Sequence, residues 1–239
     1  MGFLKKKRFW TDVAVVGSKG GYAIHLDGRV VKTPEKHDLN VPTRAAAELI
    51  AKEWAVVEGT LDPSKMPATQ WANVAIDRVD EKHYEVVEML ASYGDTDLLC
   101  YRSTHPDELV TRQAAVWDSP LEWAKAAFDA PLKITQGVIP VDQPNQSILN
   151  LRAEVAKMEP FTLSAFHDLV NISGSLVLSL AVFHGQMSSE SAWDAAQVDE
   201  IWQKEIWGED EEAIAATEQK RQTYIFAVKL LKSLEESGY

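Results

Sequence analysis

The sequence predicts an α+β protein, in which a β-rich N-terminal domain over residues 1–70 precedes a larger all-helical C-terminal domain over residues 71–239. Two observations lead to this prediction. The first forty residues hold strand-like runs separated by turn signals, and apolar residues recur at helical spacing through most of the remaining chain. Strands gathered at one end of a sequence and helices at the other are typical of α+β proteins or of two separate domains.

The Asp27-Gly28 pair predicts a β-hairpin near the N-terminus. Strand-like runs at residues 22–26 and 29–33 flank the pair, and both central residues of a type I′ turn need a positive φ, which Asp and Gly tolerate. Residues 8–16 are also strand-like, and the Gly-rich segment 17–21 after them predicts another turn. The start of the chain is therefore expected to form a small antiparallel sheet.

A helix is predicted at about residues 44–58, at the end of the β-rich domain. Thr43 is suited to cap its N-terminus, and Gly59 is suited to stop it. Trp54 belongs to an apolar stripe that repeats at helical spacing along this segment. We therefore expect Trp54 to be buried and to have a structural role.

The rest of the chain is predicted to be helical, apart from an extended segment at residues 131–141. Residues 71–93 have helical spacing with a break near Asp80, and Pro120 is expected to end one helix and begin another. The Ser173-Gly174-Ser175 segment lies inside a helical pattern and indicates close packing between helices. The expected helices after residue 100 span residues 107–117, 120–128, 147–158, 162–183, 189–206 and 210–236.

Charge and composition argue against several classes of partner. Lys and Arg total 24 against 36 Asp and Glu, which gives a formal net charge of −12 that repels nucleic acid and anionic lipid. The longest apolar stretch, Leu176–Phe183, is much shorter than the roughly 20 residues that span a bilayer, so membrane insertion is not expected. A single cysteine, Cys100, excludes an internal disulfide and predicts a buried structural thiol in a reducing compartment.

Known catalytic motifs are missing from the sequence. There is no Walker A loop, no Gly-x-Gly-x-x-Gly, no His-Glu-x-x-His and no Gly-x-Ser-x-Gly, and none of the six histidines pairs with another at i, i+4. We therefore predict no cofactor, no metal and no enzymatic activity.

The Asp95-Thr96-Asp97 segment is the one alternative that the sequence leaves open. Two carboxylates so close together are suited to hold a metal ion or to act as an acid–base pair, as in a metal-dependent hydrolase. The interpretation we favour is a structural turn at the end of a helix, in which Asp95 or Thr96 caps the backbone and Asp97 pairs with Arg102.

Acidic residues and tryptophan gather near the C-terminus. Between Asp199 and Glu218 there are eight acids and one base, Lys204, and the same stretch holds Trp202 and Trp207. Tryptophan beside charged residues is typical of protein-binding surfaces.

The sequence also carries an ordered set of short motifs. They are Arg8-Phe9-Trp10, Leu26-Asp27-Gly28-Arg29, Thr33-Pro34, Leu39 to Thr43, Glu53-Trp54, Met66-Pro67-Ala68-Thr69, Asp95 to Arg102, Gln113, Trp117-Asp118, Trp123, Asp199-Glu200, Gln203 and Trp207-Gly208. In this order the sequence resembles a known family, the assembly chaperones of the F1-ATPase α subunit that occur in mitochondria and related bacteria. The resemblance covers nearly the whole chain from Arg8 to about Leu231.

The resemblance implies an ATP-independent chaperone that binds the newly made α subunit and prevents its aggregation before the β subunit arrives. It implies that the acidic residues after Trp207 contact the client: Glu211 matches the family's functional acid, with Asp210 and Glu212 beside it. It also implies that Trp54 matters for fold integrity. An aromatic residue that often follows the functional acid is replaced here by Glu212.

The family pattern begins almost at Met1, which favours a bacterial member in the cytoplasm, whereas a eukaryotic member would lie in the mitochondrial matrix. We expect the protein to be a monomer when free. A structural adaptor without chaperone action is the remaining alternative among binding proteins.

Overall fold

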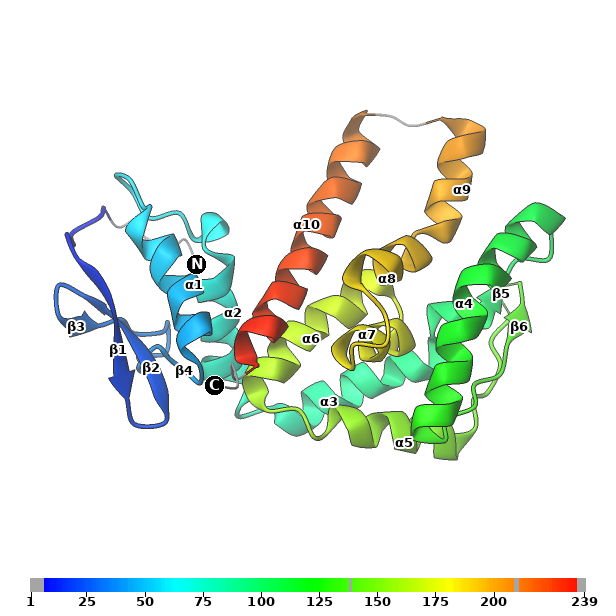
Figure 1. Ribbon diagram of the computed structural model, residues 1–239, viewed down its shortest axis with the longest axis horizontal. Helices are drawn as coiled ribbons and strands as arrows, with labels where there is room; N and C mark the ends of the chain where they lie inside the picture. The colour runs from blue at the N-terminus through cyan, green and yellow to red at the C-terminus, as the bar shows by residue number, and fades with distance from the viewer. Residues whose placement is uncertain (1–6, 138, 209–210, 236–239) are drawn as a thin grey trace. The chain divides into compact units, whose positions relative to one another are not determined.

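The computed structural model describes residues 7–137, 139–208 and 211–235 (Figure 1). The chain divides into two compact units. The first comprises Met1–His83, Glu159–Ala165 and Lys229–Tyr239, and the second comprises Tyr84–Met158 and Phe166–Val228. A small N-terminal sheet precedes a mainly helical chain, which confirms the predicted α+β class. The division into one domain over residues 1–70 and another over residues 71–239 stays a prediction.

The sheet of the first unit is built around its second strand. The strands are β1 (Val13–Ser18), β2 (Gly21–Leu26), β3 (Arg29–Val30) and β4 (Asn40–Val41). Strand β2 pairs antiparallel with β1, β3 and β4. Asp27 and Gly28 have φ values of 47° and 79°, which confirms the predicted turn with two positive φ angles.

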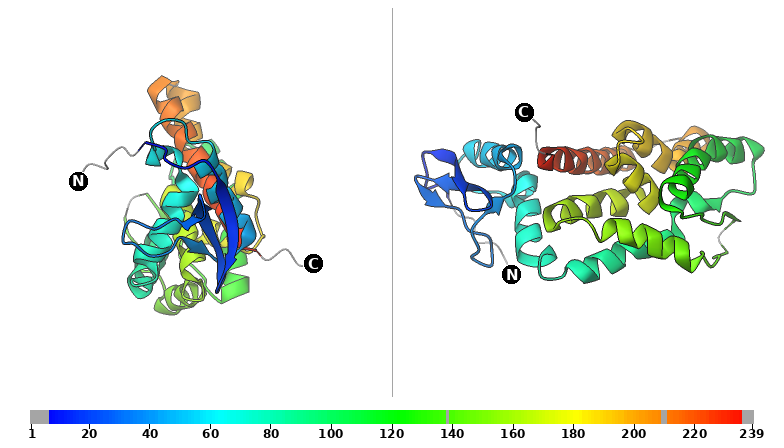
Figure 2. Two further views of the ribbon diagram at one scale, coloured as in Figure 1. Left: turned by 90° about the vertical axis from the view of Figure 1, so that its left-hand side faces the viewer. Right: turned by 60° about the horizontal axis from the view of Figure 1, so that its bottom comes forward.

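Helix α1 (Arg44–Ala55) packs on this sheet (Figures 1 and 2). The Thr43 hydroxyl accepts the Ala46 N–H at 3.2 Å, so the predicted cap is confirmed, although the helix ends three residues before the expected end. Trp54 is 9% exposed, and its carbonyl accepts the indole N–H of Trp10 at 3.2 Å. The centroids of the two indole rings lie 5.1 Å apart, so Trp54 joins α1 to the segment around Trp10 that precedes β1.

A carboxylate on α1 caps the next helix of the first unit. Glu53 accepts the N–H groups of Ala68 and Thr69 at 2.6 and 2.8 Å, at the start of α2 (Pro67–Val74), after the short turn η1 (Pro63–Lys65). Burial raises the pKa of Glu53. Helix α2 continues as the π-helix η2 (Ala75–Val79), and α3 (His83–Ala91) begins after a break. The prediction of helical structure interrupted near Asp80 is therefore confirmed.

The second unit is a set of packed helices with one short parallel strand pair. Strand β5 pairs with β6 inside the segment that was expected to be extended. The elements that follow α3 are η3 (Ser92–Thr96), η4 (Leu98–Cys100), β5 (Tyr101–Arg102), α4 (Asp107–Phe128), β6 (Thr135–Gln136), α5 (Asn145–Val155), α6 (Pro160–Ser173), α7 (Leu176–Phe183), α8 (Ser189–Ala196), α9 (Val198–Trp207) and α10 (Glu211–Leu234).

The core of the second unit surrounds Trp117 on α4. This side chain is fully buried, and its indole N–H donates to the Ala195 carbonyl on α8 at 2.7 Å. Cys100 lies in the same cluster and is also fully buried, as predicted. Burial raises the pKa of the Cys100 thiol to about 12, so the thiol stays protonated and unreactive near neutral pH.

Helix α4 corrects the prediction that Pro120 separates two helices. The helix is continuous from Asp107 to Phe128 and contains Pro120 in its interior. Trp117, Leu121 and Ala124 are buried on both sides of Pro120 in one cluster. Packing of this face outweighs the cost of an interior proline, which is about 3 kcal/mol in an isolated helix.

Two long helices of the prediction are broken in the structure. The expected helix 162–183 ends at Gly174, whose φ is 67°, and Ser175 caps α7 by accepting the Leu178 N–H at 3.0 Å. The Ser-Gly-Ser segment therefore ends one helix and caps the next, and both of its serines are buried. The expected helix 189–206 is likewise divided at Gln197 into α8 and α9. The predicted ends of the last helix, at 210 and 236, lie outside the described residues.

Candidate functional site

Two helices of the second unit project beyond the others. Helix α9 (Val198–Trp207) and the first half of α10, residues 211–223, extend past α7 and α8 in Figure 1 and in the left-hand view of Figure 2. We call residues 198–208 and 211–223 the α9–α10 arm. No residue of α9 is buried, and in residues 211–223 every side chain is exposed except that of Thr217, which is half-buried.

The α9–α10 arm exposes large apolar side chains. Trp207 is 83% exposed, Ile206 is 54% exposed, and Ile214 on α10 is 45% exposed. A helix whose side chains face solvent on all sides gains little from packing within its own chain. A surface of this kind is typical of a site that another polypeptide covers.

The α9–α10 arm also exposes carboxylates. Glu211 and Glu212 are exposed in the first turn of α10, where the helix dipole favours negative charge. Neither forms an ion pair or hydrogen bond with another residue of the described part of the chain, so both are open to an incoming partner. Asp210, the third predicted partner-binding acid, lies outside the described residues.

Arg112 on α4 contacts the middle and the last turn of α9. Its guanidinium donates to Glu205 at 2.7 Å and to Glu108 at 2.9 Å, and its carbon Cζ lies 4.8 Å from the ring centroid of Trp202. These hydrogen bonds raise the pKa of Arg112. Glu205 is therefore an acid of the arm that is already paired within the chain, unlike Glu211 and Glu212.

Gln113 makes a second connection between α4 and α9. Its side-chain oxygen accepts the Ser103 N–H at 2.8 Å, and its nitrogen donates to Asp199 at 2.7 Å. Gln113 is 1% exposed, so both hydrogen bonds are shielded from water. The first turn of α9 is thereby held on the core of the second unit, while the tip of the arm is not.

The Asp95 to Arg102 segment is part of the scaffold beneath the arm. Asp97 is fully buried, and its two carboxylate oxygens accept the Leu99 N–H at 3.1 Å and the Val177 N–H at 3.0 Å. The expected Asp97–Arg102 pair is not formed. Arg102 pairs with Asp118 at 2.8 Å because its guanidinium lies against Trp117 on α4, with Cζ 5.3 Å from the ring centroid.

The metal-site alternative finds no support in this geometry. Asp95 is exposed, whereas the Asp97 carboxylate is enclosed and its oxygens are occupied by backbone N–H groups. Within residues 7–137, 139–208 and 211–235, no three His, Cys, Asp or Glu side chains come together in a way that suits a metal ion.

The sequence and fold match those of known chaperones. A family model described as "ATP12 chaperone protein" matches residues 7–125. The crystal structure of Atp12 from Paracoccus denitrificans has a TM-score of 0.91 and 43% identity, and the match covers 96% of this chain and 98% of that chain. The chain belongs to the ATP12 chaperone family.

Further structures and one further relative match over similar lengths. A solved structure of a mutant of the Paracoccus denitrificans Atp12p has a TM-score of 0.92 at 43% identity, covering 96% of this chain and 98% of that chain. The Atu1473 protein of Agrobacterium tumefaciens has a TM-score of 0.90 at 37% identity, with coverages of 96% and 86%. The mitochondrial atp12 protein of Schizosaccharomyces pombe is 27% identical over 224 residues, which are 87% of this chain and 75% of that protein.

Several motif residues of this ATP12 family member make the long-range contacts described above. Glu53 caps α2 at the Met66 to Thr69 motif, and Gln113 and Asp118 connect α4 to Asp199 and Arg102. The sequence analysis did not predict a role for Arg112. Its i, i+4 spacing from Glu108 is visible in the sequence, but its pairing with Glu205, 93 residues away, is not.

In the part of the chain that the structure describes, no helix has both the length and the apolar character needed to cross a membrane.

Proposed function

We propose that this protein is an ATP-independent assembly chaperone that binds the unassembled α subunit of F1-ATPase and keeps it from aggregating until the β subunit arrives. The α9–α10 arm is the proposed contact surface, with Trp207, Glu211 and Glu212 touching the client and Asp210 beside them. The observation that carries the proposal is the exposed apolar and acidic arm in a member of a chaperone family.

An unassembled subunit of a ring complex exposes an apolar interface that tends to aggregate. Trp207 and Ile206 offer an apolar surface to cover part of such an interface, since aromatic side chains bury much area at low entropic cost. Glu211 and Glu212 are exposed in the first turn of α10, where they orient basic client residues and increase the association rate more than the affinity.

Release of the client follows from competition in this proposal. The α9–α10 arm supplies a surface and no catalytic group, so nucleotide hydrolysis has no part in it. The β subunit displaces the chaperone when it covers the same face of the α subunit. We further propose that the free protein is a monomer without enzymatic activity. The bacterial relatives favour a cytoplasmic location, and the mitochondrial relative favours the matrix for eukaryotic members.

A charge reversal on the arm tests the proposal. The α subunit is co-expressed with tagged wild-type protein, with Glu211→Lys or with Glu81→Lys, and the captured α subunit is quantified after size-exclusion chromatography. Glu81 is exposed and belongs to the first unit, so Glu81→Lys applies the same change of net charge to a residue that is not part of the arm. We expect Glu211→Lys to lower capture while the circular dichroism spectrum stays unchanged, and Glu81→Lys to retain capture. Wild-type levels of capture by Glu211→Lys would contradict the role of the arm.

Chaperone action is separated from simple adaptor binding by a second measurement. Light scattering of the α subunit alone is followed with and without the protein. A chaperone suppresses the increase in scattering in proportion to its concentration, whereas an adaptor that binds only assembled subunits leaves the scattering unchanged.

A further inference from the structure

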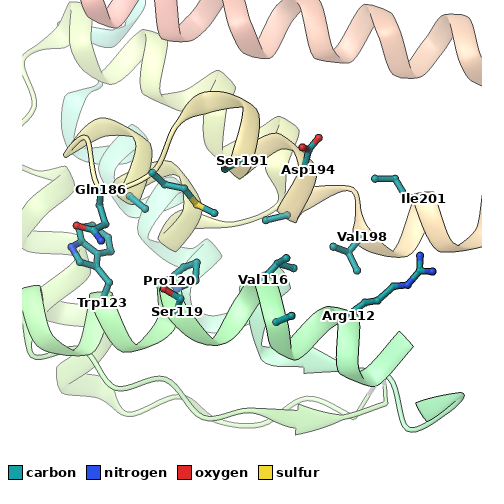
Figure 3. Close-up of a pocket in the computed structure, with 14 residues that line it drawn as sticks. Arg112, Val116, Ser119, Pro120, Trp123, Gln186, Ser191, Asp194, Val198 and Ile201 are labelled. Atoms are coloured by element: carbon teal, nitrogen blue, oxygen red, sulfur yellow. The ribbon is translucent and has the colours of Figure 1, made fainter. Parts of the chain in front are cut away.

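An open apolar groove lies at the base of the α9–α10 arm (Figure 3). It runs between α4 on one side and α8 with the start of α9 on the other, within the second unit, and it has a volume of about 730 Å³. Trp123 and Gln186 lie at one end, and Arg112 and Ile201 lie at the other (Figure 3). Ile201 also belongs to α9, so the groove is continuous with the arm.

The α4 wall has the dimensions of a short helix-binding site. Arg112, Val116, Pro120 and Trp123 face the groove at spacings of four, four and three residues, so they form one stripe along α4. At a rise of 1.5 Å per residue this stripe is about 16 Å long, which matches about three turns of a docked helix.

The floor of the groove is apolar, and its polar side chains are at the rim. Ala181 and Ala195 back the groove from the buried core, and Met187, which is half-buried, adapts to different apolar partners. Ser119, Ser191 and Asp194 are exposed at the edges. Small-molecule sites hold a few polar groups deep inside an apolar pocket, so this arrangement suits a polypeptide better.

The two walls carry a strong excess of negative charge. Residues 112–123 and 186–201, all of which the structure describes, contain six acids and one base. Two of the acids, Asp118 and Glu122, pair with Arg102 and Lys125. That base is Arg112, and it is already engaged by Glu108 and Glu205. Asp194 lies in the lining itself and has no ion pair with the described residues. Since the chain as a whole has a net charge of −12, a second copy is a poor electrostatic match for the groove.

We propose that this groove receives a short amphipathic helix of the client, whose apolar face lies on α4 and whose flank carries lysine or arginine facing Asp194. Helix-in-groove binding reads apolar side chains at i, i+3, i+4 and i+7, which is the spacing of the stripe on α4. This inference rests on the proposed function, because it assigns to the same client a second contact beside the arm.

Crosslinking from the groove tests which segment enters it. Cys100 is fully buried, so a new surface cysteine is labelled selectively with a maleimide-benzophenone probe. Ser119→Cys places the probe at the rim, and Ala153→Cys places it on the exposed side of α5 as a control. In the co-expressed complex with the α subunit, we expect Ser119→Cys to crosslink to one amphipathic, basic α-subunit segment and Ala153→Cys to give no such product. Crosslinks to a second copy of the chaperone, or to a segment without basic residues, would overturn the proposal.

A blocking variant gives an independent test. Ala115 lines the groove but is exposed, so Ala115→Trp fills the groove without disturbing the core. We expect about tenfold weaker binding of the α subunit, the effect of losing one well-packed contact, with unchanged circular dichroism and melting temperature. Unchanged affinity would overturn the groove proposal. The two proposals can be tested separately. If Glu211→Lys lowers capture and Ala115→Trp does not, the client binds the arm and not the groove. If Ala115→Trp lowers capture and Glu211→Lys does not, the client binds the groove and not the arm.

Discussion

The Asp97 carboxylate accepts a hydrogen bond from the backbone N–H of Val177, 80 residues further along the chain, at a distance of 3.0 Å. Its other oxygen accepts the Leu99 N–H at 3.1 Å. One buried side chain thus caps the N-terminus of α7 and closes the η4 turn, from which Cys100 enters the core around Trp117. This double cap fixes the helices on which α4 and α9 are positioned.

Replacement of Asp97 by Asn is expected to destabilise the protein. The amide has one acceptor oxygen, so one of the two N–H groups loses its partner and remains buried, which costs about 1–3 kcal/mol. Asp97→Ala removes both acceptors and is expected to cost more. Urea unfolding followed by circular dichroism measures the loss. Equal stability of Asp97→Asn and wild type would show that the two N–H groups find other partners.

The same carboxylate is expected to make stability depend on pH. Burial raises the pKa of Asp97 from 3.8 to about 6 in the folded protein. Between these values the folded state holds more protons than the unfolded state, so the contribution of Asp97 is fully present below about pH 4 and decreases as the pH rises to about 6. The stability difference between wild type and Asp97→Asn should therefore shrink over this interval. Subtracting the stability of Asp97→Asn from that of wild type removes the contributions of the other carboxylates. A stability difference that grows with pH would contradict the prediction.

Local features of the fold were predictable, because their causes lie within a few residues of each other. The Thr43 cap and the turn at Asp27-Gly28 follow from side-chain and backbone chemistry over three or four positions. Continuity of α4 through Pro120 and the break at Gly174 were not predicted. Trp117 and Leu121, on either side of Pro120, pack against residues distant in sequence, and the caps at the start of α7 include Asp97 from far upstream.

The candidate site, too, was predictable from sequence only in its local features. Composition alone indicated an acidic, tryptophan-bearing segment, and Trp207 is indeed highly exposed in the structure. The partner-binding roles of Trp207, Asp210, Glu211 and Glu212 stay predictions. The contacts that position the arm, from Arg112 to Glu205 and from Gln113 to Asp199, join residues 93 and 86 positions apart, and no periodicity in the sequence reports such pairs.

Gly21→Ala is expected to disrupt the sheet of the first unit. A Cβ atom at Gly21 would lie 2.2 Å from the Val41 carbonyl oxygen, and φ at this position is 156°. The obstacle is backbone, which cannot rotate away, so we expect a loss of about 3 kcal/mol. Gly17→Ala is the matched control, because a Cβ there meets nothing within 4 Å. Thermal unfolding compares the two variants, and a similar melting temperature for both would contradict the close approach of β2 and β4.

Arg112→Met is expected to loosen the α9–α10 arm with little effect on global stability. Exposed ion pairs each contribute about 0.2–1 kcal/mol, so the free energy of unfolding should fall only slightly. Loss of the Glu205 pair and of the contact with Trp202 should increase hydrogen exchange in α9. Lys125→Met is the control, since it removes an exposed pair with Glu122 on the same helix. Exchange rates in α9 that match those of the control would show that Arg112 does not hold the arm.

Trp207 is expected to report client binding directly. Its side chain is 83% exposed, so Trp207→Phe should change the free energy of unfolding by no more than about 0.5 kcal/mol. The fluorescence of wild type minus that of Trp207→Phe isolates this indole from the other seven tryptophans. In the free protein the difference spectrum should have the emission of a water-exposed indole and be readily quenched by iodide. On addition of the α subunit it should shift to shorter wavelength and lose quenching, because the client excludes water from the ring. A difference spectrum that stays unchanged at saturating α subunit would remove Trp207 from the contact surface, while leaving Glu211 and Glu212 to be judged by their own variants.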